Sequence, residues 1–356
     1  MVTLVIPTKN RSDFLIRILR YYADTNYQYT ICIGDSSEQF HLDTTKKFID
    51  SLNGKLKIMY FEYPGLGISL CFKKLINQVK TPYAAIVLDD DFIIEQSLRK
   101  CVDFLENNLD YSSAGGRAIV FSLKEPGAHG EIKNVGVYSQ RNIEGKTASQ
   151  RLADHLKNYT VTLFSVHRIE TWRHLWQNVV KSSERAFMEE LIPCCLSVIH
   201  GKKKVFDDLY LVRQDHEQRA FHMDTYDWVT HQDWFNSYNI FHDSLEEALA
   251  YKDGISRDEA HGVIKEGFWK YLNKSFVSKY DIRYKTKIEG INLKKIIKRS
   301  PTVFNIANYI QLLFRRHLKV STLLNKKSPY CSNFAAVYRA VTEKPLFGNK
   351  VYCNID

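Results

Sequence analysis

Residues 83–91 of the chain read YAAIVLDDD. The first six are hydrophobic without interruption, which is the pattern of a β-strand buried on both of its faces. Three carboxyl side chains follow at once, those of Asp89, Asp90 and Asp91. This stretch therefore predicts a sheet covered on both faces and a polar site where the strand ends.

The residues before this stretch repeat the same alternation of strand and helix patterns. Three earlier stretches that are mostly apolar are also predicted to be strands: residues 2–6, 30–33 and 56–61. Apolar residues at helical spacing fill the intervals between them, and the connections are short. This order predicts an α/β, Rossmann-like fold with a mainly parallel sheet flanked by helices. Ligands of such sheets bind outside the carboxyl ends of the strands, where residues 7–10, 35–37 and 89–91 all lie.

The three adjacent carboxyl groups indicate a cation site. Carboxylates repel one another, so clustering them without basic neighbours costs energy unless they share a cation. A hard divalent ion held by one or two carboxylates together with phosphate oxygens meets that need. On an extended backbone Asp89 and Asp91 point to the same side, which predicts an Asp-x-Asp clamp. The alternative is a solvated turn, or a helix cap formed by Asp91.

Four motifs, taken in order, resemble those of the family 2 glycosyltransferases, which have the GT-A fold. They are IPTKNR at residues 6–11, GDSS at residues 34–37, GLG at residues 65–67 and LDDD at residues 88–91. Each motif is weak alone, and their order and spacing make the set fairly specific over residues 1–125. One departure is Gly34, where the family often has an acidic residue.

The resemblance implies a nucleotide-diphosphate sugar as donor, with a UDP-sugar expected, and Mn²⁺ or Mg²⁺ as cofactor. It implies that Asp35 binds the nucleotide base and that Asp89 and Asp91 bind the ribose and the metal. The residues expected to bind the nucleotide sugar are Pro7, Thr8, Asn10, Arg11, Asp35, Ser36, Lys73, Asp89 and Asp90. The residues expected to bind the metal are Asp89, Asp91 and His216. For Lys73, a position exposed to solvent is an equal alternative to a contact with the nucleotide.

A second acidic cluster begins the helix predicted at residues 187–200. Family 2 enzymes place a Glu-Asp pair at the start of a comparable helix, and this alignment gives Glu190 the position of the general base. An inverting transfer needs one carboxylate to remove the acceptor hydroxyl proton as that oxygen attacks the anomeric carbon. The metal meanwhile stabilises the departing diphosphate. Glu189 is the rival base, and both glutamates also suit the positive end of a helix without any catalytic role.

The middle of the chain has a less regular pattern. Strands are predicted at residues 118–121, 160–166 and 204–212, and a loop at residues 124–150. Arg213 and His216 follow the last strand, as candidates for a phosphate contact and for a third metal ligand. An isolated histidine is more often structural than functional.

Helical patterns dominate after residue 225. We therefore predict a GT-A nucleotide-sugar-binding and catalytic domain at residues 1–225, and a mostly helical, basic C-terminal extension at residues 226–356. The net charge of the chain is +10, and residues 283–327 alone carry +11. This segment is expected to form a basic patch that binds an anionic membrane surface. The alternative is that the segment forms a helix packed on the core. No nucleic acid is expected as partner, because the core itself is not basic.

The sequence has no secretory signal pattern and no apolar run of about 20 residues, so we expect a cytoplasmic protein, peripheral on the inner face of the plasma membrane. The leading hypothesis is an inverting glycosyltransferase acting on a glycan or lipid-linked acceptor in bacterial surface polysaccharide synthesis. A sugar nucleotidyltransferase is the second enzyme hypothesis, but it would want a glycine-rich loop after the first strand, where this chain has PTKN. Two further hypotheses are a non-catalytic scaffold with the same fold and a nucleic-acid binder.

Overall fold

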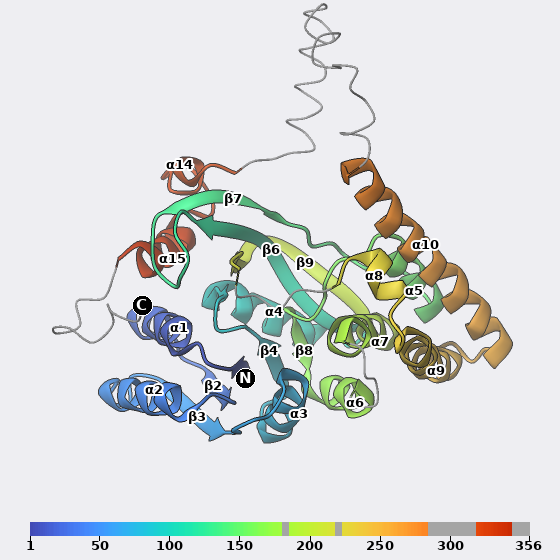
Figure 1. Ribbon diagram of the computed structural model, residues 1–356, viewed down its shortest axis with the longest axis horizontal. Helices are drawn as coiled ribbons and strands as arrows, with labels where there is room; N and C mark the ends of the chain where they lie inside the picture. The colour runs from blue at the N-terminus through green and yellow to red at the C-terminus, as the bar shows by residue number, and fades with distance from the viewer. Residues whose placement is uncertain (180–184, 218–222, 284–317, 344–356) are drawn as a thin grey trace, which may run out of the picture.

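The computed structural model describes residues 1–179, 185–217, 223–283 and 318–343. The elements in chain order are β1 (Val2–Thr8), α1 (Ser12–Asp24), β2 (Thr30–Asp35), α2 (Gln39–Ser51), β3 (Lys57–Glu62), α3 (Ile68–Gln78), β4 (Tyr83–Ile86), β5 (Phe92–Ile93), α4 (Glu95–Asn107), β6 (Tyr111–Leu123), β7 (Ile132–Tyr138), α5 (Ala148–Lys157), β8 (Val166–Arg168), α6 (Ile169–Val179), the π-helix η1 (Ala186–Leu191), α7 (Ile192–His200), β9 (Lys202–Gln214), α8 (Thr225–Val229), α9 (Trp234–Asp253), α10 (Arg257–Arg283), α14 (Val320–Leu323) and α15 (Cys331–Thr342). The strands form one nine-stranded sheet with helices on both sides (Figure 1).

The first half of the sheet is parallel. Strands β3, β2, β1 and β4 lie side by side in that order and run in the same direction. All seven residues of β1 are buried, as expected for a strand covered on both faces. These strands confirm the predicted α/β sheet. Because parallel strands end at one edge, Thr8, Asp35 and the acidic triplet (Asp89, Asp90 and Asp91) lie along the same edge.

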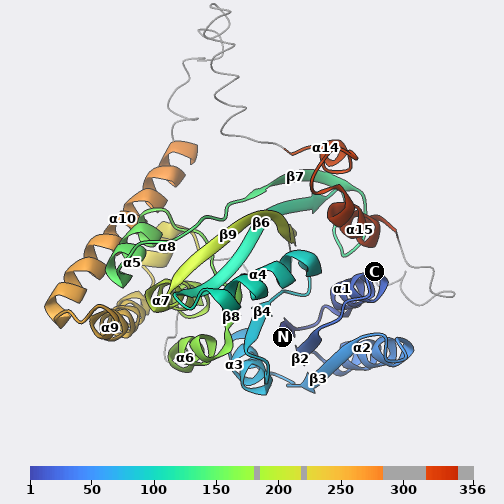
Figure 2. The same ribbon diagram turned by 180° about the vertical axis from the view of Figure 1, so that it is seen from behind.

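The second half of the sheet is mixed. It continues from β4 through β8, β6, β9 and β5, and β7 pairs with β6. Strand β8 is antiparallel to both of its neighbours, whereas β6 and β9 are parallel to each other. Figure 2 shows the reverse side of the molecule, where α4 lies across the strands. The sheet is thus mostly parallel, with β8 inserted as an antiparallel strand and with β5 and β7 pairing antiparallel to β9 and β6.

Two predictions for the middle of the chain are wrong. Residues 160–166 are not a strand: Ser165 N donates to Thr162 O at 3.1 Å and closes a turn, so that β8 begins only at Val166. The predicted loop at residues 124–150 contains β7 and the start of α5. Strand β7 forms a ladder with β6 and a single bridge from Val135 to Leu318 on its other side, and its Lys133, Asn134 and Gly136 interrupt the apolar pattern of a buried strand.

The two-residue strand β5 determines the surroundings of the acidic triplet. It runs antiparallel to β9, with Phe92 opposite Val212 and Ile93 opposite Leu211. Continuing this register by one residue sets Asp91 opposite Arg213, which lies 122 residues later in the chain. The end of β9 is thereby brought to the carboxyl end of β4.

Two hydrophobic clusters fill the space between the sheet and its helices. Alternate residues of β1 belong to different clusters, Leu4 and Ile6 to the first and Val5 to the second, because successive side chains on a strand point to opposite faces. Phe334 of α15 belongs to the first cluster, and Phe268 of α10 belongs to the second. The residues after 225 therefore pack on both sides of the sheet, and the domain boundary at residue 225 stays a prediction.

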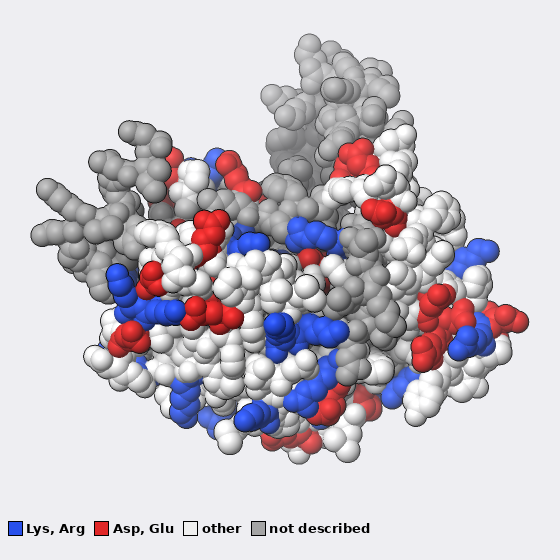
Figure 3. All heavy atoms as spheres, turned by 60° about the horizontal axis from the view of Figure 1, so that its bottom comes forward, with Lys and Arg blue, Asp and Glu red and all other residues white. Residues whose placement is uncertain are grey.

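Among the residues described, no helix is both long enough and apolar enough to cross a bilayer. The predicted membrane-binding segment falls mainly on residues 284–317, which lie outside the described residues. On the face shown in Figure 3, acidic and basic side chains are interspersed.

Candidate active site

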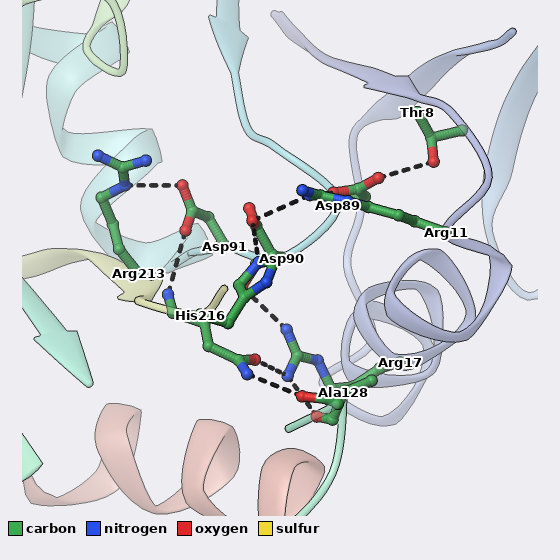
Figure 4. Close-up of polar contacts among 11 residues, drawn as sticks. Thr8, Arg11, Arg17, Asp89, Asp90, Asp91, Ala128, Arg213 and His216 are labelled. Atoms are coloured by element: carbon green, nitrogen blue, oxygen red, sulfur yellow. Dashed lines mark hydrogen bonds and ion pairs between the residues drawn. The ribbon is translucent and has the colours of Figure 1, made fainter. Parts of the chain in front are cut away.

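The acidic triplet is buried in a turn just beyond β4 (Figure 4). Asp89 and Asp90 are each 3% exposed, and Asp91 is fully buried. The backbone is not extended here, because Asp91 N donates to Leu88 O at 3.1 Å and closes a turn. The prediction of an Asp-x-Asp clamp on an extended backbone is therefore wrong, since it required the strand to continue, whereas β4 ends at Ile86.

Basic side chains surround the triplet, contrary to what the local sequence suggests. Arg11 Nη1 donates to Asp89 Oδ1 at 3.0 Å and to Asp90 Oδ2 at 3.1 Å. Arg213 Nε donates to Asp91 Oδ2 at 2.8 Å. One arginine comes from the start of α1 and the other from the end of β9. Their charges offset part of the repulsion among the carboxylates.

Asp91 is anchored to β9 through both of its oxygens. Oδ2 accepts from Arg213, and Oδ1 accepts from the backbone N of Gln214 at 3.2 Å. The Arg213 guanidinium also lies over the rings of Tyr138 and Phe164, at 4.8 and 4.3 Å from their centroids. Burial raises the pKa of Asp91 to about 7, and the Arg213 charge offsets part of this shift. Asp91, which directly precedes β5, thus connects that strand to the end of β9.

Asp90 has one oxygen that remains available. Its Oδ2 atom lies 2.7 Å from His216 Nε2 and also accepts from Arg11. Its Oδ1 atom is buried and has no hydrogen-bond partner among the described residues. Burial acts to raise the pKa of Asp90, but the His216 hydrogen bond and the Arg11 charge outweigh it, and the pKa is lowered. The His216 ring stacks on Phe14 at 4.8 Å between centroids, which fixes its orientation.

Asp89 joins the triplet to the end of β1. Thr8 Oγ1 donates to Asp89 Oδ2 at 2.7 Å, and Arg11 holds the other oxygen. Burial and the neighbouring Asp90 charge raise the pKa of Asp89 to about 7. Two of the residues predicted to bind the nucleotide sugar, Thr8 and Arg11, are therefore in direct contact with the triplet.

Arg17 is part of this network, although the sequence motifs do not point to it. The residue is 1% exposed, and its Nη2 atom donates to Asp90 O at 2.8 Å. Its Nη1 atom donates to Ala128 O and to Gln214 Oε1. Burial lowers the pKa of Arg17 to about 10, and the acidic triplet opposes this shift. The sequence does contain an indication of this buried role, because Arg17 is a charged residue on the otherwise apolar face of α1.

Replacing Arg17 with Met should lower the free energy of unfolding by about 3–5 kcal/mol, because buried acceptors lose their charged donor. Urea denaturation followed by circular dichroism measures this change. Arg99→Met is the matched control on α4, where the arginine side chain is 73% exposed and 4.0 Å from Asp103. We expect the control to change stability by about 0.5 kcal/mol or less. Equal losses in both variants would contradict the assigned role.

The expected base-binding residue, Asp35, lies at the end of β2 and is 1% exposed. Its Oδ1 atom accepts from Ser37 N at 3.0 Å, and its Oδ2 atom accepts from Tyr60 OH at 2.7 Å. Ser36 is also buried, and its backbone N donates to Thr8 O at 2.9 Å. The ends of β1 and β2 are thus hydrogen-bonded to each other next to Asp89.

Asn10 connects the loops that follow β1 and β2. Its φ of 56° lies in the left-handed region, which asparagine tolerates better than most residues. Its backbone N donates to Ser37 Oγ at 2.6 Å, and its Oδ1 atom accepts from Glu38 N at 2.8 Å. Pro7 is buried within β1. Lys73 is half-buried on α3, and the structure records no contact between it and the acidic triplet.

The glycine at position 34 has a steric explanation. A Cβ atom at Gly34 would lie 2.6 Å from Cys71 Sγ and 2.9 Å from Leu75, both on α3. The close packing of α3 on β2 therefore excludes the acidic residue that family 2 enzymes often have here.

The two candidate bases lie on η1, a single π-helical turn, which is a conformation frequent at functional sites. Glu189 accepts from Ser69 Oγ at 2.8 Å through Oε1 and from Arg185 Nη2 at 2.7 Å through Oε2. Glu190 Oε1 accepts from Tyr159 OH at 3.1 Å. An ion pair with arginine weakens Glu189 as a base.

Tyr138 relates Glu190 to the acidic triplet. Burial raises the pKa of Tyr138 to about 12, with Arg213 opposing the shift and the Glu190 charge adding to it. The same tyrosine ring lies under the Arg213 guanidinium, so Tyr138 senses the charges of both Arg213 and Glu190.

A divalent cation fits part of this donor set. The available Asp90 Oδ1 atom, Asp89 and the His216 imidazole are ligand types that Mn²⁺ accepts. Their ligand atoms do not all lie within 4.8 Å of one another, since Arg11 bridges Asp89 and Asp90. A cation held by these groups would replace the Arg11 charge. Asp91, with both oxygens engaged, contributes least to such a set.

The comparisons with known proteins concern the family of residues 3–168 and the fold. Residues 3–168 match the sequence profile of glycosyl transferase family 2. A search of curated protein sequences gives no match. Among solved structures, TarS 1-349 of S. aureus in complex with UDP-GlcNAc is similar, with a TM-score of 0.52, 12% identity, and coverage of 80% of this chain and 76% of that chain. A second TarS structure has a TM-score of 0.50 and 12% identity over 80% of this chain and 45% of that chain.

At this identity the TarS structures show the fold alone, which is the GT-A fold. The sequence profile covers β1 to β8, and so includes the edge that carries Thr8, Asp35 and the acidic triplet. Residues 3–168, just under half of the chain, are thereby identified as a glycosyltransferase region of family 2.

Proposed function

We propose that the protein transfers a sugar, with inversion, from a UDP-sugar to a hydroxyl group of a glycan or lipid-linked acceptor. The observation that carries this proposal is the meeting of Thr8, Asp89, Asp90 and His216 at the carboxyl edge of the parallel strands. A UDP-sugar is favoured because TarS, which shares the fold, binds UDP-GlcNAc in its crystal structure.

In this proposal Asp89, Asp90 and His216 hold Mn²⁺ or Mg²⁺, and Asp91 keeps Arg213 in place. The cation supplies positive charge to the donor's diphosphate. Arg11 is 19% exposed at its side chain, which leaves it accessible to solvent and to the donor. Once released from the two carboxylates, Arg11 is suited to pair with the diphosphate, because guanidinium groups bind phosphate in a bidentate manner. Asp35, Ser36 and Asn10 shape the edge proposed to receive the nucleoside.

Glu190 is the proposed general base. As the acceptor oxygen attacks the anomeric carbon, its proton passes to the Glu190 carboxylate. A new bond joins that oxygen to the anomeric carbon, and the bond from the anomeric carbon to the diphosphate oxygen breaks. The diphosphate leaves with the electron pair on the opposite face, so the configuration inverts.

A donor screen tests this function directly. The full chain is incubated with a panel of nucleotide sugars, with and without Mn²⁺ or Mg²⁺, and release of the nucleoside diphosphate is measured. We expect a UDP-sugar to be hydrolysed or transferred only in the presence of a divalent cation. Release of pyrophosphate from a sugar phosphate and a nucleoside triphosphate would instead indicate a nucleotidyltransferase. Absence of turnover and of nucleotide binding would support the non-catalytic scaffold.

We also propose a cytoplasmic location with peripheral attachment to the membrane, through the net charge of +11 on residues 283–327. Surface polysaccharide or glycolipid synthesis would suit such a location, because its acceptors carry lipid anchors. Sedimentation with vesicles tests this, and binding that requires anionic lipid and weakens with salt is the expected result. Equal binding to neutral vesicles would contradict it.

A further inference from the structure

Helices α9 and α10 carry three metal-ligating side chains away from the acidic triplet. His242 and Glu246 are four residues apart on α9 and so share one face of that helix. His261 lies in the second turn of α10, which packs against α9. All three lie beyond residues 3–168, the part of the chain that matches the family profile.

The three side chains converge on one point. His242 Nδ1 is 3.7 Å from Glu246 Oε2, and His261 Nδ1 is 4.0 Å from the same oxygen. The imidazole centroids are 4.6 Å apart, with an interplanar angle of 61°. One ligand atom from each residue lies within 4.8 Å of the other two, and among the described residues this is the only such group. Tetrahedral zinc with bonds of about 2.0–2.1 Å sets its ligands about 3.3–3.5 Å apart, so little movement is needed.

Burial and access are both suitable for a metal ion. The side chain of His242 is 9% exposed and that of Glu246 is 18% exposed, whereas that of His261 is 52% exposed. The ion therefore has a protected inner wall and an open side. The Nδ1 atom of His242 faces Glu246 and is the nitrogen available as a ligand, while the buried Nε2 atom has no hydrogen-bond partner among the described residues.

We propose that His242, Glu246 and His261 bind one zinc ion, which fastens α9 to α10. Two imidazoles and one carboxylate are a known zinc ligand set, and water completes the tetrahedron. Imidazole-rich sites prefer zinc to Mg²⁺ or Mn²⁺. The site is therefore chemically distinct from the cation site proposed at the acidic triplet.

The test is a zinc titration of the untagged full chain, first stripped with a chelator, in competition with a chromophoric chelator. The expected result is one zinc ion per chain and a higher melting temperature with zinc, neither of them reproduced by Mg²⁺. His261→Ala should weaken binding about 100-fold or more, since changes outside the ligand shell alone cost 10–100-fold. Glu246→Gln, which preserves side-chain volume, should weaken binding as well and serves if the first variant does not fold.

The matched control is His231→Ala, which removes a histidine paired with a single carboxylate, 3.8 Å from Asp233. This variant should keep full zinc affinity. Asp90→Asn should also keep it, so failure of the proposed sugar transfer leaves this test unaffected. Absence of stoichiometric zinc, or equal affinity in the His261→Ala and His231→Ala variants, would overturn the proposal and leave an ordinary ion-paired cluster.

Discussion

Asp90→Asn is expected to lower the turnover of the proposed transfer about 10²–10³-fold, the usual effect of removing one electrostatic group from a preorganised site. Asp90 offers the available carboxylate oxygen and contacts both Arg11 and His216. Asparagine keeps the shape of the side chain but removes the charge that would bind a divalent cation. Initial rates against Mn²⁺ concentration measure the effect, and the variant should need far more metal for half-maximal rate.

Asp91→Asn is the matched comparison within the triplet. Because Asp91 is fully buried and paired with Arg213, its replacement leaves an uncompensated charge and should lower stability by about 3–5 kcal/mol. Denaturant unfolding should therefore separate the two variants, with Asp90→Asn closer to the unmodified protein. An Asp90→Asn variant with normal turnover and normal metal dependence would remove Asp90 from the proposed cation site.

Glu190→Gln is expected to lower kcat about 10²–10⁴-fold, since a positioned general base contributes this much. The glutamine side chain can still accept a hydrogen bond from Tyr159 OH, so the fold around η1 should persist. Donor binding does not depend on the base, and calorimetric titration with UDP and Mn²⁺ should give an unchanged affinity. The loss should therefore appear in kcat for transfer, with little change in KM for the donor.

Glu189→Gln tests the rival base on the same helical turn. Ser69 and Arg185 engage both oxygens of Glu189, so this variant should lose stability and keep most of its turnover. The reverse pattern, with Glu189→Gln inactive and Glu190→Gln active, would assign the base to Glu189. Normal turnover in both variants would contradict a base on η1.

Local patterns in the sequence predicted a large part of the fold and of the candidate site. Strands β1 to β4 and the helices between them were predicted from apolar patterns in the sequence. Such patterns involve only residues close together in the chain, so they can be recognised without a structure. The parallel order of those strands follows from short connections and a fixed handedness. Thr8, Asp35 and Asp89 could therefore be placed at one edge, where the structure has them.

The partners of the acidic triplet could not be predicted in this way. Arg17 lies on α1 as a single polar interruption, and only the packed structure shows that it donates to Asp90 O. Strand β7 resembles a loop in sequence because Lys133, Asn134 and Gly136 interrupt its apolar residues. The zinc-ligand group proposed here joins His261 to Glu246 across two helices, and no spacing within either helix reveals that contact.

By itself, the sequence determined the GT-A sheet, the edge at which its polar residues collect and the glutamate pair on a later helix. The tertiary structure alone decided which charges neutralise the acidic triplet and which oxygens remain available. The physical reason is the range of the interactions. Strand and helix patterns arise between residues close in the chain, whereas Asp91 meets Arg213 only because β5 pairs with β9 across 122 residues.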